Sequence, residues 1–299
     1  MNDQHEVFQF GELIPYQERL NEIPVLEPYS TRDGDTLSFR RYLAMSDVHV
    51  ILLHGSSAHS AYLDPFAKHL SDLDIANVYA LDLRGHGPNP KCRGDINYIG
   101  QIEDDIADLI AHIQLNVGES AKFIIAGHSS GGGMALRFAG SQYSSLVSGA
   151  FLLAPYFGHN APMARKNAGG WAMPSIAKII GISILNGFGV QRYNGMKVLK
   201  FNLPEKYHTG YETLQYSFRL MNGLHPLDYQ ASLSCMRAPL LIVVDSKDEA
   251  LHATKFESNV LPYKADTEVS YIQGSSHLGI VLNDSAMAEV AAWIGELGG

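Results

Sequence analysis

Short apolar runs alternate with longer amphipathic segments along most of this 299-residue chain. The runs that we expect to form buried strands are residues 48–53, 78–83, 123–126, 147–153, 240–244 and 268–272. Apolar residues at helical spacing mark an amphipathic helix in the segment 99–117: Ile102, Ile106, Leu109, Ile110 and Ile113. Strands that alternate with helices predict a parallel sheet with helices on both faces. The pattern therefore predicts an α/β fold.

The ends of the chain differ from this central pattern. Residues 1–23 are unpatterned and predict an arm or an edge. An Asp33-Gly34 turn between two strand-like segments predicts a hairpin. Further helices are expected at 62–70, after residue 133, and at 285–297 with Asp284 as the N-cap.

Residues 156–227 interrupt the alternation of strands and helices. They are rich in Gly, Met and aromatic residues, with helix-like patches at 176–185 and 211–221. We interpret the segment as a helical cap inserted between two strands, which divides the chain into a core domain, 1–155 and 228–299, and a cap, 156–227. Large apolar side chains of the cap, among them those of Ile176, Ile180, Ile184 and Phe188, either line the site, which would favour acyl chains or aromatic groups, or pack in the cap's own core. We expect the second for most of them.

Composition restricts the possible partners. The formal net charge of −9 and the lack of a basic run argue against nucleic acid and anionic membrane surfaces. The sequence contains no run of eighteen apolar residues, so we expect no transmembrane helix, and its polar start does not resemble a signal peptide. Cys92 and Cys235 lack C-x-x-C spacing, which favours a reducing compartment. We expect a cytoplasmic protein without integral membrane association, and no metal or cofactor motif is present.

Residues 127–131, Gly-His-Ser-Ser-Gly, fit the pattern G-x-S-x-G between an expected strand and an expected helix. This context is typical of a nucleophile elbow, in which a strained turn exposes the serine hydroxyl. The glycines avoid a Cβ that would crowd the neighbouring strand or helix. The N–H of Ser130, at the helix start, can donate to an oxyanion. The alternative interpretation is a glycine-rich turn with Ser129 as a helix cap.

Polar residues also follow three other expected strands, where ligands of an open parallel sheet bind. The N–H of Ser56 follows the first strand as a candidate second oxyanion donor, and the neighbouring His54 is expected to be structural. Asp245 and Asp248 follow the fifth strand, and either can orient a histidine. His277, between the last strand and the last helix, suits a general base.

The order of serine, acid and histidine resembles that of the α/β-hydrolases, and most of all the monoacylglycerol lipase and lysophospholipase-like group. The likeness spans about Tyr29 to the C-terminus apart from the cap. The matching segments are 54–57 (His-Gly-Ser-Ser), 82–87 (Asp-Leu-Arg-Gly-His-Gly), 127–131, Asp248 and His277. It implies an α/β-hydrolase fold with a mostly parallel central sheet, helices on both faces and an inserted helical cap.

The resemblance also implies roles for these residues. Ser129 is the nucleophile and His277 the base. The acid lies at Asp248, and Asp245, where many relatives have Gly, stays the alternative. The 82–87 motif is structural, with Asp82 and Arg84 together fixing a loop below the site.

These roles predict a serine hydrolase that cleaves a small-molecule carboxylic ester through an acyl-enzyme. Ser129 argues against the aspartate-nucleophile chemistry of dehalogenases and epoxide hydrolases. Fold alone leaves other chemistry of the same triad open: hydrolysis of a C–C bond, a thioester or an amide (as in an aminopeptidase), perhydrolysis or acyl transfer. A catalytically silent α/β-hydrolase that binds a small molecule is a further alternative.

Overall fold

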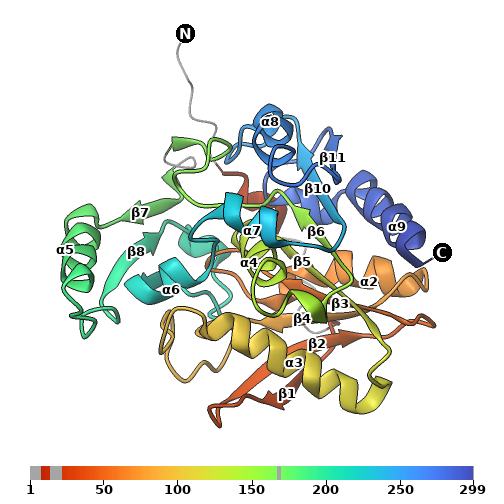
Figure 1. Cartoon of the computed structure of the whole chain (residues 1–299), viewed down its shortest axis with the longest axis horizontal. Helices are drawn as coiled ribbons and strands as arrows, with labels where there is room; N and C mark the ends of the chain where they lie inside the picture. Colours follow the sequence, from red (N-terminus) through yellow and green to blue (C-terminus); the bar gives the residue numbers. More distant parts are fainter. Residues whose placement is uncertain (1–7, 14–21, 167–169, 299) are drawn as a thin grey trace.

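Eight strands form the central sheet of the computed structural model, which describes residues 8–13, 22–166 and 170–298 (Figure 1). Their order is β1-β2-β4-β3-β5-β6-β10-β11. The strands are β1 Leu26–Ser30, β2 Thr36–Tyr42, β3 Val48–Leu53, β4 Asn77–Asp82, β5 Lys122–His128, β6 Gly149–Leu153, β10 Leu240–Asp245 and β11 Thr267–Ile272. Strand β2 pairs antiparallel with both β1 and β4. The six neighbouring strands β4, β3, β5, β6, β10 and β11 are parallel to one another. The predicted fold class is confirmed.

Helices cover both faces of this sheet. They are α2 Asp64–Asp72, α3 Gln101–Val117, α4 Ser130–Ala139, α7 Tyr229–Cys235, α8 Phe256–Val260 and α9 Asp284–Gly298. Helices α2 and α9 pack against each other, and so do α4 and α7 (Figure 1). Strands β4, β6 and β10 are buried along their whole length because both of their faces are covered. This burial explains why these strands read as continuous apolar runs.

The chain leaves the sheet between β6 and β10, where the cap was expected. This insertion contains α5 Ile176–Gly187 and α6 Phe218–Gly223, and also a three-stranded antiparallel sheet of β7 Ala172–Pro174, β8 Lys197–Phe201 and β9 Gln215–Ser217. The insertion is therefore mixed rather than purely helical. The helix expected at 211–221 begins only at Phe218, because residues 215–217 pair with β8. Tertiary pairing overrides a short helical periodicity there.

Two other details depart from the expectations. The N-cap of α9 is Asn283, whose Oδ1 accepts a hydrogen bond of 3.1 Å from the N–H of Ala286, whereas Asp284 lies within the first turn. The outer face of α5 does not pack in a cap core: Ile176, Ile180 and Ile184 are 57%, 54% and 56% exposed. Only Ile182 of this helix is buried. Periodicity shows that a helix has an apolar side but not that a neighbour covers it.

Helix α5 lies at the outer edge of the molecule, on the side away from α9 (Figure 1). Ile182 packs there in a small cluster with Val198 and Phe218. Within the part of the chain that the structure describes, no helix is both long and apolar enough to cross a membrane.

Truncation of two isoleucines in α5 separates the buried side of this helix from the exposed one. We expect Ile182→Ala to lower the free energy of unfolding by about 2–4 kcal/mol, because it opens a cavity in the small cluster. The matched variant Ile180→Ala should change it by less than about 0.5 kcal/mol, because that side chain is already in solvent. Urea denaturation followed by circular dichroism measures both, and equal losses would contradict the assignment of the two faces.

Candidate active site

Ser129 lies in a strained turn between β5 and α4. Its backbone has φ 55° and ψ −120°, a conformation that is costly for a residue with a side chain. A Cβ on Gly127 would collide with the backbone of Gly131, and a Cβ on Gly131 would collide with the carbonyl oxygens of Leu53 and His54. The turn therefore requires both glycines, and it has the strand–turn–helix geometry that the G-x-S-x-G pattern predicts.

Three predicted side chains meet at this turn, although they come from the ends of different strands. The hydroxyl of Ser129 lies 2.9 Å from Nε2 of His277. Nδ1 of the same imidazole lies 2.8 Å from Oδ2 of Asp248. The other carboxylate oxygen of Asp248 accepts hydrogen bonds of 2.7 and 2.8 Å from the N–H groups of Ala250 and Leu251. The acid is thus held in one orientation toward the imidazole.

Burial and charge set the protonation of this pair. Burial lowers the pKa of His277, but the charge and hydrogen bond of Asp248, with the charge of Glu249, outweigh it and raise the pKa above its ordinary value. Burial raises the pKa of Asp248, but the imidazole and the N–H groups of Ala250 and Leu251 outweigh it and lower the pKa. The site therefore favours an ionised Asp248 and stabilises a protonated His277.

The predicted oxyanion donors flank Ser129. The hydroxyl of Ser56 donates a hydrogen bond of 2.9 Å to the hydroxyl of Ser130, which joins the loop after β3 to the start of α4. Among the described residues, neither backbone N–H of this pair has a hydrogen-bond acceptor. Both amides are therefore free to bind an anionic oxygen next to Ser129, and the amide of Ser130 is also at the positive end of α4.

Asp245, the alternative acid, has another position. Its two carboxylate oxygens accept hydrogen bonds from the N–H groups of Lys247 (2.7 Å) and Ser275 (2.8 Å). It joins the turn after β10 to the loop that carries His277. The geometry therefore places Asp248, and not Asp245, at the imidazole.

His128, the residue before the serine, is buried and fastens the site. Its Nε2 donates to the carbonyl oxygen of His277 at 2.8 Å, and its Nδ1 accepts from the hydroxyl of Tyr62 at 2.7 Å. The Tyr62 oxygen in turn accepts from the N–H of Gly55 at 2.7 Å. Burial lowers the pKa of His128 to about 3, with a smaller effect of His277, so this histidine is neutral. It links three loops, a role that the sequence analysis missed.

Glu249 is a second carboxylate at the base that the sequence analysis missed. Its Oε2 accepts a hydrogen bond of 2.8 Å from the backbone N–H of His277, and the side chain is only 7% exposed. Its Oε1 has no hydrogen-bond partner among the described atoms. The sequence signal that could have identified Glu249 is its position directly after Asp248, in the same loop after a strand.

The 82–87 motif is structural, but its two charged residues act separately, which corrects the expectation that they fix one loop together. Asp82 accepts a hydrogen bond of 2.6 Å from the N–H of Ser60. Arg84 pairs instead with Asp105 of α3 at 2.7 Å and with Asp35 at 2.9 Å. His54 is structural as predicted: it accepts from the N–H of Leu83, and burial lowers its pKa to about 4.

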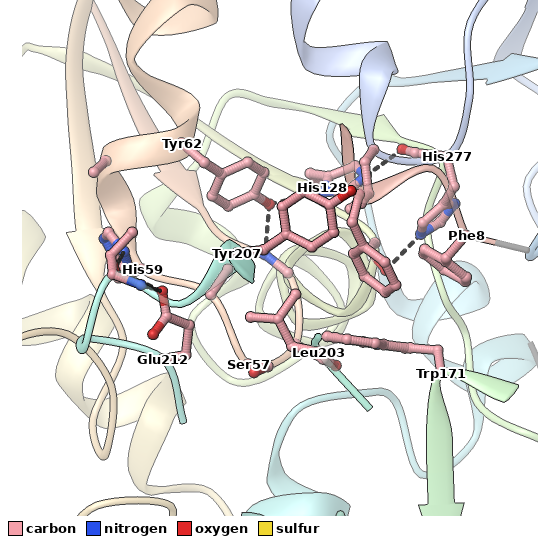
Figure 2. Close-up of a pocket in the computed structure, with 18 residues that line it drawn as sticks. Phe8, Ser57, His59, Tyr62, His128, Trp171, Leu203, Tyr207, Glu212 and His277 are labelled. Atoms are coloured by element: carbon pink, nitrogen blue, oxygen red, sulfur yellow. Dashed lines mark hydrogen bonds between the residues drawn. The ribbon is translucent and has the colours of Figure 1, made fainter. Parts of the chain in front are cut away.

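A cavity of about 90 Å³ opens beside Ser129 and His277 (Figure 2). Its lining includes aromatic side chains, among them Phe8 and Phe10 of the N-terminal region and Trp171 of the insertion. The arm expected at residues 1–23 therefore contributes to the site in its described part, 8–13, whereas 1–7 and 14–21 lie outside the described residues. The unpatterned sequence of residues 8–13 gave no signal of this contact.

Two further features concern metals and thiols. Within the described residues, no group of three or more His, Cys, Asp or Glu is arranged to hold a metal ion. Cys92 and Cys235 are both free and exposed.

A nucleophile turn after β5, with an acid after β10 and a histidine after β11, defines the class of α/β-hydrolases. The chain belongs to the α/β-hydrolase family described as "Serine aminopeptidase, S33", whose family model matches residues 45–278. This membership confirms the predicted class of enzyme, a serine hydrolase.

One curated relative and several solved structures are similar to this chain. A monoacylglycerol lipase of Mycolicibacterium smegmatis is 30% identical over 106 residues, 36% of this chain and 37% of the relative, so the match spans little more than a third of either protein. A soluble variant of monoglyceride lipase from Saccharomyces cerevisiae has a TM-score of 0.66 at 16% identity, with 92% of this chain and 96% of that one covered. The monoacylglycerol lipase of Paleococcus ferrophilus has a TM-score of 0.67 at 17% identity, with 87% and 99% covered. At these identities the structures show the shared fold.

Removal of the Glu249 charge should lower the pKa of His277. Glu249→Gln keeps an oxygen that can accept from the N–H of His277, but it removes one of the negative charges that favour the imidazolium. NMR titration of the imidazole, with the His277 signal assigned by its loss in His277→Asn, measures the shift. The control Glu289→Gln, on the exposed side of α9, should leave this pKa unchanged. An unchanged pKa in Glu249→Gln would show that the carboxylate does not act on the base.

Proposed function

We propose that this protein hydrolyses carboxylic esters of small molecules through a triad of Ser129, His277 and Asp248. The observation that supports this most directly is the position of the His277 imidazole, 2.9 Å from the Ser129 hydroxyl and 2.8 Å from the Asp248 carboxylate. Nucleophile, base and orienting acid within hydrogen-bond reach are the geometric signature of acyl transfer.

In the first half of the proposed reaction, the Ser129 oxygen attacks the ester carbonyl while Nε2 of His277 takes the hydroxyl proton. Asp248 stabilises the imidazolium that forms. The carbonyl oxygen becomes an oxyanion, which the N–H groups of Ser56 and Ser130 bind. Collapse of the tetrahedral intermediate breaks the C–O bond, and His277 gives its proton to the departing alkoxide oxygen. An acyl-enzyme remains on Ser129.

In the second half, water attacks the acyl-enzyme. His277 takes a proton from this water, and the same two amides bind the second oxyanion. Collapse returns the proton to the Ser129 oxygen and releases the carboxylic acid. No group beyond these side chains, these amides and water is needed to balance the two steps.

The similarity to monoacylglycerol lipases supports an ester as the substrate. The same triad also cleaves amides, thioesters and C–C bonds or transfers acyl groups, and the family description names an aminopeptidase. Rates on p-nitrophenyl esters, on a monoacylglycerol and on aminoacyl p-nitroanilides, measured side by side, distinguish ester from amide chemistry. A fluorophosphonate probe that fails to label Ser129 in the folded protein would instead favour a silent binding protein.

We further propose the division into a core, 1–155 and 228–299, and a cap, 156–227, that contributes Trp171 to the cavity at Ser129. The proposed partner is a small-molecule ester or acyl substrate. Cytoplasmic location and the lack of nucleic-acid binding stay predictions from composition.

Loss of the nucleophile gives the first test of the mechanism. Ser129→Ala should lower kcat/KM for p-nitrophenyl butyrate by a factor on the order of 10⁴ or more, because no other group replaces the attacking oxygen. The Ser141→Ala variant, in a loop after α4, serves as a control of the same chemical change. Near-complete activity in Ser129→Ala would contradict the proposed mechanism.

Comparison of two isosteric variants tests the identity of the acid. Asp248→Asn should lower kcat by a factor on the order of 10⁴, because an amide cannot hold the imidazole in the required tautomer or stabilise its charge. Asp245→Asn should lower kcat by less than about 10-fold per folded molecule, because its carboxylate oxygens accept from the backbone N–H groups of Lys247 and Ser275 and not from the imidazole. Steady-state kinetics normalised to the concentration of folded protein, checked by circular dichroism, gives both values. The reverse order of losses would assign the acid to Asp245.

A further inference from the structure

Residues 8–13 lie over the cavity at Ser129 and close one side of it with aromatic rings. Phe8 and Phe10 are 6% and 8% exposed. The Phe8 ring stacks on those of Phe10 and Trp171, with centroids 5.7 and 5.8 Å apart, and meets the His277 ring edge-on at 5.4 Å. Figure 2 shows Phe8 beside His277, with Trp171 on the same side of the cavity. The N-terminal region therefore contacts the proposed base directly.

The loop of the base holds this segment in place. The hydroxyl of Ser276 donates a hydrogen bond to the Glu12 carboxylate and accepts one of 2.9 Å from the N–H of Gly279. The Glu12 carboxylate also lies close to Gly279, where an added Cβ would require it to shift. On the other side, Phe10 packs against Tyr207 with a centroid distance of 5.8 Å. The aromatic rings are thus fastened at both ends.

The space that these rings leave is small. Its volume of about 90 Å³ is less than the roughly 150 Å³ of an apolar cavity that holds the six carbons of benzene. Scaled by volume, the cavity accommodates an acyl group of about four carbons. The rings of Phe8, Phe10 and Trp171 line this space, and we expect longer acyl chains to meet them.

The charge of the cavity restricts the acyl group further. Glu212 lines the cavity, and its carboxylate accepts hydrogen bonds from the N–H groups of Thr209 (2.7 Å) and Gly210 (3.0 Å). Burial raises the pKa of this carboxyl, but its hydrogen bonds outweigh it and lower the pKa, so Glu212 is ionised. An acyl group with a second carboxylate would be repelled by this charge.

We propose that Phe8, Phe10 and Trp171 limit the acyl group to about four carbons, so that the enzyme prefers neutral short-chain esters to long-chain ones. This inference rests on the proposed ester hydrolysis at Ser129 and names the substrate class of the same site. The three rings determine specificity by steric exclusion. Phe8 has this role although it lies 121 residues before Ser129 in the chain.

A chain-length series tests the size limit. We measure kcat/KM for p-nitrophenyl acetate, butyrate, hexanoate and octanoate, below their micellar concentrations, and count active sites with a fluorophosphonate probe. The wild-type protein should prefer butyrate to octanoate by about 10-fold or more, because misfitting methylenes cost at least that factor. Phe8→Ala and Phe10→Ala should each raise the octanoate-to-butyrate ratio by about 10-fold. Phe8→Leu, with an intermediate volume, should give a smaller increase.

Phe188→Ala is the matched control, because Phe188 is 80% exposed on the insertion and does not line the cavity. It should leave the octanoate-to-butyrate ratio unchanged. A wild-type protein that cleaves octanoate as well as butyrate would overturn the size limit, and so would Phe8 and Phe10 variants whose ratio equals that of Phe188→Ala. A protein that neither cleaves any of the four esters nor reacts with the probe would overturn the proposed function itself. The two failures are therefore distinguishable.

Discussion

The strained backbone of Ser129 is the constraint on which the site depends. A positive φ at a serine costs about 1–3 kcal/mol, and the surrounding contacts must maintain it. Ser129 is held by its own N–H, which donates to the carbonyl oxygen of Leu153, and by its carbonyl oxygen, which accepts from the N–H of Tyr156. Both partners belong to β6 or directly follow it, so the neighbouring strand imposes the turn. The proposed nucleophile lines the cavity because contacts with the neighbouring strand hold its residue in this turn.

Contacts to the backbone also position His277. Asp248 orients the imidazole ring, while Glu249 and His128 hold the N–H and the C=O of the same residue. The ring and the backbone of the base are thus fixed by separate groups. Because His128 also reaches Gly55 through Tyr62, a displacement of any one of the loops after β3, β5 and β11 would disturb the other two. Buried hydrogen-bond networks of this kind favour one arrangement.

The order in which apolar runs and polar residues follow one another along the sequence predicted much of the fold and of the candidate site. The runs that form β3, β5 and β10 are apolar because helices cover both faces, and the polar residues that follow them converge at one edge of a parallel sheet. Sequence reasoning failed where the outcome depends on distant contacts. Nothing near Phe8 indicates that its ring lies against His277, and nothing in the periodicity of α5 indicates that Ile180 stays in solvent. Likewise, β9 exists only because β8 lies beside it.

The distribution of charge across the site relates these features to the proposed chemistry. Asp248 and Glu249 lie on the side of His277 away from Ser129 or at its backbone, and their negative charges favour the imidazolium that forms when Ser129 attacks. The same charges oppose the oxyanion that forms at that moment, and this repulsion is strong where water is excluded. Donors of opposite sign are therefore needed on the other side of the serine. In the proposed mechanism the N–H groups of Ser56 and Ser130 are these donors, and the N–H of Ser130 is also at the positive end of α4. In that proposal, carboxylates at the base and amides at the serine stabilise the two opposite charges of the transition state together.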